Sequence, residues 1–218
     1  ITKIISRKKN TFFLIKIKKN IIKNYQGKYK FNLNLLGKHN ILNATASIGV
    51  GLLLKLPINK IKNALKNFQG VKRRFTFLGK IKKASIYDDY AHHPTEIQAT
   101  LEAAKYITKN KVVVIFQPHR YSRIKTLYTD FLNVLMKADY LFISDIYPAG
   151  EKPIKGINAL KLVRDITKKG AKNVYYLSNF KTLKSSLSSL FENRNLIIFM
   201  GAGSISHSAN DLIKNAHV

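Results

Sequence analysis

Apolar and polar positions alternate along the first 36 residues, in three short runs separated by lysine and asparagine. The runs are TKIIS at 2–6, TFFLIKI at 11–17 and YKFNLNLL at 29–36. Alternation with a period of two residues is typical of strands that bury one face. This pattern predicts a small antiparallel edge to a larger sheet.

The spacing of apolar residues then becomes helical. GKHNILNA at 37–44 opens a helix that is rich in Ala and Leu and runs to about Leu56, where Pro57 stops it. A second helix follows from Ile58 to about Gly70. The run VKRRFTFLG at 71–79 is predicted to be extended. We place a domain boundary at about residue 70, which gives domains 1–70 and 71–218.

The second domain alternates between short apolar runs and helical segments. Strands are predicted near 84–88, 112–116, 140–144, 174–177 and 196–200, and helices near 94–108, 123–138, 158–169, 181–191 and 205–215. Apolar strands without strict alternation, separated by helices, indicate a mainly parallel sheet that is covered on both faces. The fold class is therefore α/β, with a Rossmann-like second domain.

The composition of the chain bears on its cellular location and on whether it spans a membrane. The longest apolar stretch, at 44–54, is shorter than the ~20 residues of a membrane span, so no membrane partner is expected. The first residues lack both an initiator Met and the order of a signal peptide, and we interpret the chain as a piece of a longer one. The absence of cysteine suits a reducing cytoplasm.

The net charge of +28 raises the hypothesis of a nucleic-acid-binding module. The distribution favours another interpretation, because only seven of the 39 basic residues are Arg and the lysines are spread through almost every segment. Nucleic-acid readers favour forked Arg on one face. We therefore expect a solvated lysine-rich surface and no specific nucleic-acid partner, although the charge would attract a nucleotide substrate.

Two loops concentrate the ionisable chemistry. DDYAHHPTE at 88–96 and QPHRYSR at 117–123 hold three of the six histidines, and each follows an apolar run and precedes a helical one. DIYPAGEKPI from 145 and GAGSI from 201 occupy equivalent positions. Because parallel strands bring their carboxyl ends to one edge, the four loops are expected to converge where open α/β sheets bind ligands.

The first loop contains more than a helix start requires. Pro94, Thr95 and Glu96 fit the first turn of a helix. That role leaves five residues that indicate a site: Asp88, Asp89, Tyr90, His92 and His93. A zinc site is the alternative, but adjacent histidines do not match the usual spacing of zinc ligands, so no metal ligand is predicted here.

The second loop places Arg120 and Arg123 on one side of a turn, with Ser122 able to cap the following helix. Two forked guanidiniums can grip a carboxylate or phosphate, whereas the alternative is a pair of surface salt bridges. Arg73 and Arg74 invite the same interpretation. GAGSI is a weak signal for an anion at a helix start, and the chain contains no GxxxxGK[ST] phosphate loop.

Six motifs together resemble the Mur ligase family, which builds the peptidoglycan stem peptide. They are, in order, GKHNILNATAS, FQGVKRRF, DDYAHHPTEI, FQPHRYSR, DIYPAGEKPI and GAGSI. The resemblance covers nearly the whole chain but only the C-terminal half of the family's length. The family's UDP-binding domain, phosphate loop and carbamylated lysine have no counterpart in these residues.

The resemblance implies the roles of the two domains. Residues 1–70 would be the tail of the family's central ATPase domain, and residues 71–218 its C-terminal domain. The implied reaction uses ATP to phosphorylate the carboxylate of UDP-N-acetylmuramate, after which the amine of L-alanine attacks the acyl phosphate. Mg²⁺ is implied by the triphosphate chemistry, with ligands mostly in the missing N-terminal half, so residues 1–218 alone are expected to be inactive.

The resemblance also assigns site residues. Those expected near ATP are Asn40, Asn43, Arg74 and Asp89, and those expected around the alanine end of the substrate are Tyr90, His92, Arg120 and Arg123. Any of His92, His93 and His119 could accept the amine proton.

Three alternatives remain open. A murein peptide ligase shares the AHHP-type loop, but the HRYSR motif favours alanine addition. A lysine-rich nucleic-acid-binding module and a remnant that only binds nucleotides are hypotheses of other classes.

Overall fold

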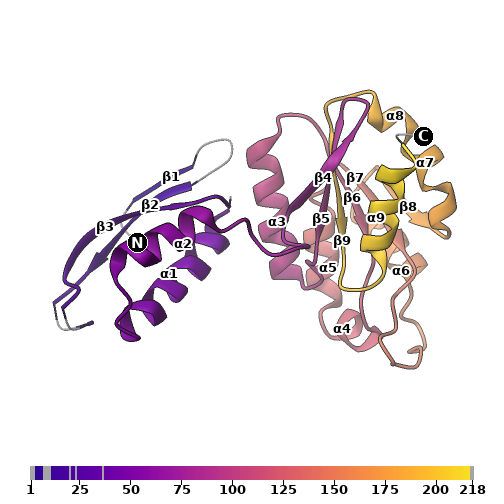
Figure 1. Ribbon diagram of the computed structural model, residues 1–218. Coiled ribbons are helices and arrows are strands. Elements are labelled where there is room, and N and C mark those ends of the chain that lie inside the picture. The colour runs from indigo at the N-terminus through magenta and orange to yellow at the C-terminus, as the bar shows by residue number, and fades with distance from the viewer. Residues whose placement is uncertain (1–2, 7–10, 20, 23, 36, 217–218) are drawn as a thin grey trace. The chain divides into compact units, whose positions relative to one another are not determined.

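The computed structural model describes residues 3–6, 11–19, 21–22, 24–35 and 37–216. It divides into two compact units, Ile1–Val71 and Lys72–Val218, each of which is described by itself (Figure 1). Residues 2 and 36, at the ends of two predicted strands, lie outside the described residues.

The first unit packs two helices on one face of a three-stranded sheet. Strands β1 (Lys3–Ser6), β2 (Thr11–Ile17) and β3 (Gly27–Leu33) pair antiparallel in that order, and α1 (Lys38–Leu53) and α2 (Ile58–Asn67) follow. Alternate residues of β2 and β3 are buried against the helices, as the alternating sequence predicts. The core comprises Phe13, Ile15, Ile17, Phe31, Leu33, Ile41, Ala44, Ile48, Leu52 and Ile61.

The three strands form a sheet of their own within the described residues. Within the described residues, no further strand pairs with this sheet, so the expected larger sheet is not formed by this part of the chain. Alternation of apolar and polar residues with a period of two indicates that one face of a strand is buried. Here α1 and α2 cover that face. The pattern carries no information about the number of strands in the sheet.

The second unit is built on a six-stranded sheet in the order β4-β5-β9-β6-β7-β8. Its strands are β4 (Thr76–Ile81), β5 (Ala84–Asp89), β6 (Val112–Phe116), β7 (Tyr140–Ser144), β8 (Val174–Leu177) and β9 (Leu196–Met200). All neighbouring pairs are parallel except β4 and β5, which form an antiparallel pair at one edge. The predicted mainly parallel sheet is confirmed.

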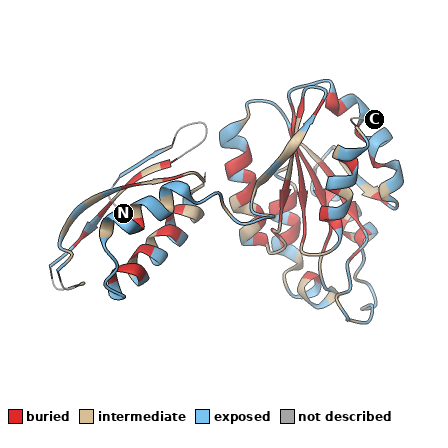
Figure 2. Cartoon of the chain, viewed as in Figure 1, coloured by how far each residue is buried: buried red, intermediate tan, exposed pale blue. Residues whose placement is uncertain are grey.

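Helices cover both faces of this sheet, and Figure 2 shows the buried residues concentrated in the strands between them. One face packs against α3 (Pro94–Ile107), α4 (Tyr121–Thr126), α5 (Tyr128–Leu135) and α6 (Ala159–Lys168). The other packs against α7 (Leu183–Ser186), α8 (Ser188–Phe191) and α9 (Ile205–Lys214). The β6 residues Val112 and Val114 face the first group, and Val113 and Ile115 face the second. This two-sided burial explains why these strands are apolar without alternation.

Three elements differ from the sequence prediction. The helix expected at 123–138 is broken at Leu127, and the one expected at 181–191 consists of the 3₁₀ turn η1 (Phe180–Thr182), α7 and α8, with a break at Leu187. Apolar periodicity continues through such breaks, so it did not reveal them. The extended run expected from residue 71 begins only at Thr76, because Arg73 and Phe75 have positive φ angles of 60° and 50°.

The segment that joins the two units offers a proteolytic site. Helix α2 ends at Asn67, and Val71 is 62% exposed next to the exposed Lys72. Since proteases require an exposed chain without secondary structure, limited trypsin digestion is expected to cut first after Lys72, giving fragments 1–72 and 73–218. Mass spectrometry of an early time point would check this. A first cut within residues 112–200 would contradict it.

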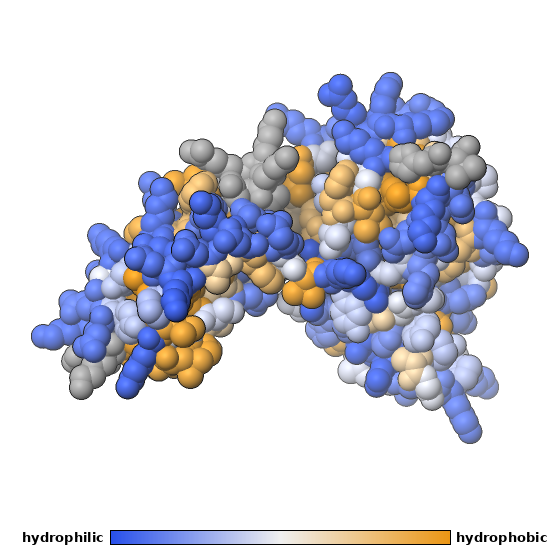
Figure 3. Space-filling view, in the orientation of Figure 1, coloured by the Kyte–Doolittle hydropathy of each residue, from blue (hydrophilic) through white to orange (hydrophobic). Residues whose placement is uncertain are grey.

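Hydrophilic side chains cover much of the visible surface, and apolar ones gather over part of the first unit (Figure 3). The exposed apolar side chains of that unit include Leu53 and Leu54, at 67% and 69%. Within the described residues, no helix combines the length and the apolarity that crossing a membrane requires.

Candidate functional site

The four predicted loops converge at one edge of the second unit. They follow β5, β9, β6 and β7, which are consecutive in the sheet and parallel, so their carboxyl ends share an edge. Contacts join each loop to the next. The N–H of Gly201 donates to the backbone oxygen of Asp89, and the Gln117 side chain donates to Ser204. The His92 ring lies beside that of His119, which lies beside that of Tyr147. The convergence expected from the sequence is confirmed.

Asp89, at the end of β5, holds the turn that carries Arg74. Its carboxylate accepts hydrogen bonds from the backbone N–H groups of Phe75 and Ala91, both at 2.7 Å. Burial raises the pKa of Asp89 to about 6, although these two hydrogen bonds and the charge of Arg74 act in the opposite direction. Both carboxylate oxygens are therefore engaged within the protein.

Helix α3 begins with a capping box formed by His93 and Glu96. The Nδ1 atom of His93 accepts from the N–H of Thr95 at 3.4 Å, and the Glu96 carboxylate accepts from the N–H of His93. Pro94 occupies the first helical position, as predicted. His93 thus has a structural role as the N-cap of α3. The sequence places it beside His92 and did not predict this role.

One ring nitrogen of His92, Nδ1, contacts other groups of the protein, whereas the other, Nε2, is available to a ligand. Its Nδ1 lies 2.8 Å from the carbonyl oxygen of Tyr90 and 3.4 Å from Oε2 of Glu96. Because a carbonyl can only accept, Nδ1 carries a proton, and in the neutral form of the ring the lone pair is on Nε2. No hydrogen bond to Nε2 is found among the residues that the structure describes. The ring meets that of Tyr90 edge-on at 5.1 Å.

His119 and Arg123 form a fixed pair. Nη1 of Arg123 lies 3.2 Å from both Nδ1 and the backbone oxygen of His119. Since arginine can only donate, Nδ1 of His119 must be unprotonated. Burial, and then the Arg123 charge, lower the pKa of His119 to about 4, so the ring is neutral at pH 7. The ring also stacks on Tyr147, at 5.4 Å between centroids.

Arg120 is held more loosely, by the carboxylate of Glu151, which the sequence did not indicate as a site residue. Its Nη1 lies 4.0 Å from Oε1 of Glu151, and its side chain is 49% exposed. Glu151 also accepts from the hydroxyl of Ser122 at 2.6 Å and from its backbone N–H at 3.0 Å, and these contacts lower the pKa of Glu151. The prediction that Ser122 caps the helix is wrong, because Arg120 is the N-cap of α4 and Glu151 accepts the Ser122 N–H instead.

The glycine loop after β9 is packed closely against its neighbours. The side-chain amide of Gln117 accepts from the N–H of Ile205 at 3.1 Å and donates to Ser204 Oγ at 3.2 Å. A methyl group on Gly203 would lie 2.5 Å from Oε1 of Gln117 and 2.7 Å from Cγ of Tyr147. The glycine in the GAGSI motif therefore permits close packing, and the first N–H of α9 is already satisfied by Gln117.

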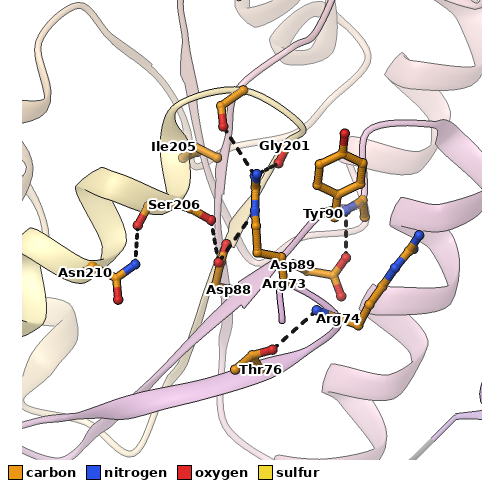
Figure 4. Close-up of polar contacts among 12 residues, drawn as sticks. Arg73, Arg74, Thr76, Asp88, Asp89, Tyr90, Gly201, Ile205, Ser206 and Asn210 are labelled. Atoms are coloured by element: carbon orange, nitrogen blue, oxygen red, sulfur yellow. Dashed lines mark hydrogen bonds and ion pairs between the residues drawn. The ribbon is translucent and has the colours of Figure 1, made fainter. Parts of the chain in front are cut away.

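Arg73 and Asp88 form a buried ionic pair beneath the loops (Figure 4). Nε of Arg73 lies 3.8 Å from Oδ2 of Asp88, whose residue is 3% exposed, and Ser206 donates its hydroxyl proton to the same carboxylate. Burial raises the pKa of Asp88, while the Ser206 hydrogen bond and the Arg73 charge lower it. The sequence pointed to both residues but to neither this pairing nor the contribution of Ser206 from α9.

The other two residues expected near ATP, Asn40 and Asn43, lie in α1 of the first unit. Arg74, by contrast, lies in the second unit, where its side chain is 50% exposed and 3.9 Å from Oε1 of Glu96. Among the described residues, no group of three or more His, Cys, Asp and Glu side chains is arranged to hold a metal ion.

The pKa of His119 leads to a pH-dependent prediction. The folded value of about 4 lies below the ordinary value of 6.5, so the unfolded chain binds a proton more readily between these two values. This group therefore lowers the stability of the second unit as pH falls from 6.5 to 4. Urea unfolding should show His119→Asn losing less free energy of unfolding than the parent chain between pH 7.5 and 4.5. Equal losses would contradict the prediction.

The family model described as "Mur ligase, glutamate ligase domain" matches residues 73–203. The UDP-N-acetylmuramate–L-alanine ligase of Rickettsia canadensis is 49% identical over 193 residues, which cover 85% of this chain and 40% of that protein. The corresponding ligase of Rickettsia felis is 46% identical over 187 residues and 39% of its length. This chain thus spans about 40% of the length of these curated relatives.

Solved structures give the same picture. The UDP-N-acetylmuramate–alanine ligase MurC of Thermotoga maritima superposes with a TM-score of 0.75 at 28% identity, covering 96% of this chain and 44% of that one. A murein peptide ligase from Psychrobacter arcticus superposes with a TM-score of 0.66 at 19% identity, covering 94% of this chain and 42% of that one. At that identity the second match shows the shared fold alone.

Proposed function

Since the chain belongs to the Mur ligase family, we propose that it supplies the amino-acid site, and part of the ATP site, of an enzyme that joins L-alanine to UDP-N-acetylmuramate. The reaction would use ATP, pass through an acyl phosphate and serve peptidoglycan synthesis in the cytoplasm. The chain would act together with a further part of the enzyme, which corresponds to the region of the relatives that the chain does not match.

The observation that carries the proposal is the Arg123–His119 pair at the convergence of the loops. Among the residues that the structure describes, the Arg123 side chain makes hydrogen bonds through Nη1 alone, so its remaining N–H groups can bind a ligand. The guanidinium is held in place before the ligand arrives. A pre-positioned guanidinium suits the α-carboxylate of an amino acid. Arg120 could add a second donor by giving up its 4.0 Å contact with Glu151. Holding the carboxylate would orient the amine for attack.

His92 is our candidate for the group that accepts the amine proton. Nδ1 of His119 is engaged by Arg123 and that of His93 caps α3, which leaves the proton of each neutral ring on Nε2. His92 has the reverse arrangement, with Nδ1 donating to the Tyr90 carbonyl and the lone pair on Nε2. A general base must have a lone pair within reach of the proton it removes. His119 would then position Arg123.

Four residues are proposed to contact or position the nucleotide. Arg74 is exposed and can contact phosphate, while Asp89 would act by holding the turn that presents Arg74. Asn40 and Asn43 in α1 would contribute near the adenine. Mg²⁺ would neutralise the triphosphate, with its ligands mostly in the part of the enzyme that this chain does not include.

Two alternatives receive less support. The identity to the alanine ligases is 49% over 193 residues, against 19% to the murein peptide ligase structure. The match of residues 73–203 to a ligase domain also supports an enzyme over a nucleic-acid-binding module.

A completed enzyme tests the proposal. It joins this chain to the upstream part of the Rickettsia canadensis ligase that the chain does not match. We expect phosphate release that requires ATP, UDP-N-acetylmuramate and L-alanine together, and no release from residues 1–218 alone, because the groups that cradle the triphosphate are then missing. Release with an L-alanyl tripeptide in place of L-alanine would favour the murein peptide ligase. Turnover by the 218 residues alone would contradict the assignment of parts.

A further inference from the structure

We infer that Arg73 is a positioning residue, which fixes the turn at 73–75 and so determines where Arg74 and Tyr90 lie. The inference rests on the proposed function for its effect on catalysis. The physical link between Arg73 and the turn stands on the contacts of the second unit alone (Figure 4).

The guanidinium of Arg73 ties the turn to the loop after β9. Its Nη2 donates to the carbonyl oxygens of Gly201 and, at 3.3 Å, Gly203. These residues lie more than 120 positions further along the chain. One side chain therefore joins the turn at 73–75 to one of the four converging loops.

The same side chain is the counter-ion of a buried carboxylate. Asp88 is 3% exposed, and Nε of Arg73 is the cationic nitrogen near it, at 3.8 Å. Neither Nε of Arg73 nor Oδ1 of Asp88 has a hydrogen-bond partner within the described residues. A buried carboxylate that loses its counter-ion is strongly destabilised. The pairing therefore keeps the Arg73 side chain directed inward.

The backbone of the turn depends on this anchor. Arg73 and Phe75 both have positive φ angles, 60° and 50°, which are unfavourable for residues with side chains. The turn is held by the Tyr90 N–H, which donates to the Arg73 carbonyl at 2.7 Å, and by the Phe75 N–H, which donates to Asp89. A strained conformation persists only where its surroundings determine it.

The two arginines have different surroundings as a result. The Arg73 side chain is 25% exposed and occupied by protein groups, whereas that of Arg74 is 50% exposed. Both guanidiniums lie near the Tyr90 ring, with their Cζ atoms 4.8 Å and 5.8 Å from its centroid. Arg73 would thus act through Arg74 and Tyr90 without touching a ligand.

Kinetics of the completed enzyme test the catalytic part. If Arg73 acts through Arg74, Arg73→Met should raise the KM for ATP roughly ten-fold, and adding it to Arg74→Ala should change that KM little further. Lys72→Met, at an exposed neighbouring position, is the control and should leave kinetics unchanged. Arg73→Lys should restore part of the effect, since it keeps the charge but can serve fewer of the acceptors. Multiplicative effects in the double variant, or a lower melting temperature with an unchanged KM, would overturn the inference.

Hydrogen exchange tests the physical link separately from ligase activity. In the 218-residue chain, the amides of Phe75 and Tyr90 should exchange faster in Arg73→Met than in Lys72→Met. Arg73→Lys serves the same test if the Met variant does not fold. Unchanged exchange at both amides would overturn the inference. An inactive wild-type completed enzyme would refute the proposed function while leaving the exchange result decisive for Arg73.

Discussion

Replacement of Arg123 by Ala is expected to lower kcat/KM for L-alanine roughly ten-fold to over a hundred-fold in the completed enzyme. The substitution removes a charged hydrogen bond to the substrate carboxylate, which contributes about 1.5–3 kcal/mol. Arg123 should matter more than Arg120, because His119 holds its Nη1 at 3.2 Å whereas Arg120 is 49% exposed and only 4.0 Å from Glu151. The KM for ATP should barely change.

Steady-state kinetics with L-alanine and ATP varied separately would check this prediction. Arg123→Lys should rescue poorly, because an ammonium cannot bridge His119 and a carboxylate as the forked guanidinium does. Arg164→Ala is a matched control, since Arg164 is 61% exposed and pairs with Asp165 on α6. It should leave the kinetics unchanged. Near-normal kinetics of both Arg123 variants would assign Arg123 to a structural role.

The fold was predictable from the sequence where apolar residues mark each element distinctly. The five parallel strands and the loops after them were placed correctly, because each gives a short apolar run, and the central strands β6 and β9 are buried along their whole length. The breaks at Leu127 and Leu187 were not predicted, since apolar spacing continues across both. The turn at 73–75 was missed for another reason, because contacts with distant residues stabilise its unfavourable backbone angles.

The sequence predicted which loops hold the site residues, but not which side chains those residues contact. The sequence pointed to Arg120, Arg123 and the histidines, because ionisable residues cluster there. It did not predict that the Glu151 carboxylate would accept a hydrogen bond from the first turn of α4, or that Arg73 would pair with Asp88. Such pairings join residues from different strand ends, so only the assembled sheet brings them together. The roles of His93 and His119 likewise follow from which ring nitrogen is engaged.

Replacement of Gly203 by Ala is the second prediction with a large expected effect. The added methyl would lie 2.5 Å from Oε1 of Gln117 and 2.7 Å from Cγ of Tyr147, so both groups must move. The Gln117 amide is fixed by Ile205 and Ser204, and the Tyr147 ring stacks on His119 with an interplanar angle of 12°. Overpacking of this kind costs about 1–3 kcal/mol of stability.

The displacement should also reach the substrate site. Tyr147 backs the His119 ring, and His119 holds Arg123, so we expect kcat/KM for L-alanine to fall at least roughly ten-fold while the KM for ATP changes less. Gly170→Ala is the control: its methyl would meet nothing within 4 Å, but its φ of 99° is unfavourable for Ala. It should lower the free energy of unfolding without changing alanine kinetics. Urea unfolding of the 218-residue chain and kinetics of the completed enzyme would measure the two effects. If Gly203→Ala changed alanine kinetics no more than Gly170→Ala does, Tyr147 and His119 would not be coupled to the arginine that we propose binds the carboxylate.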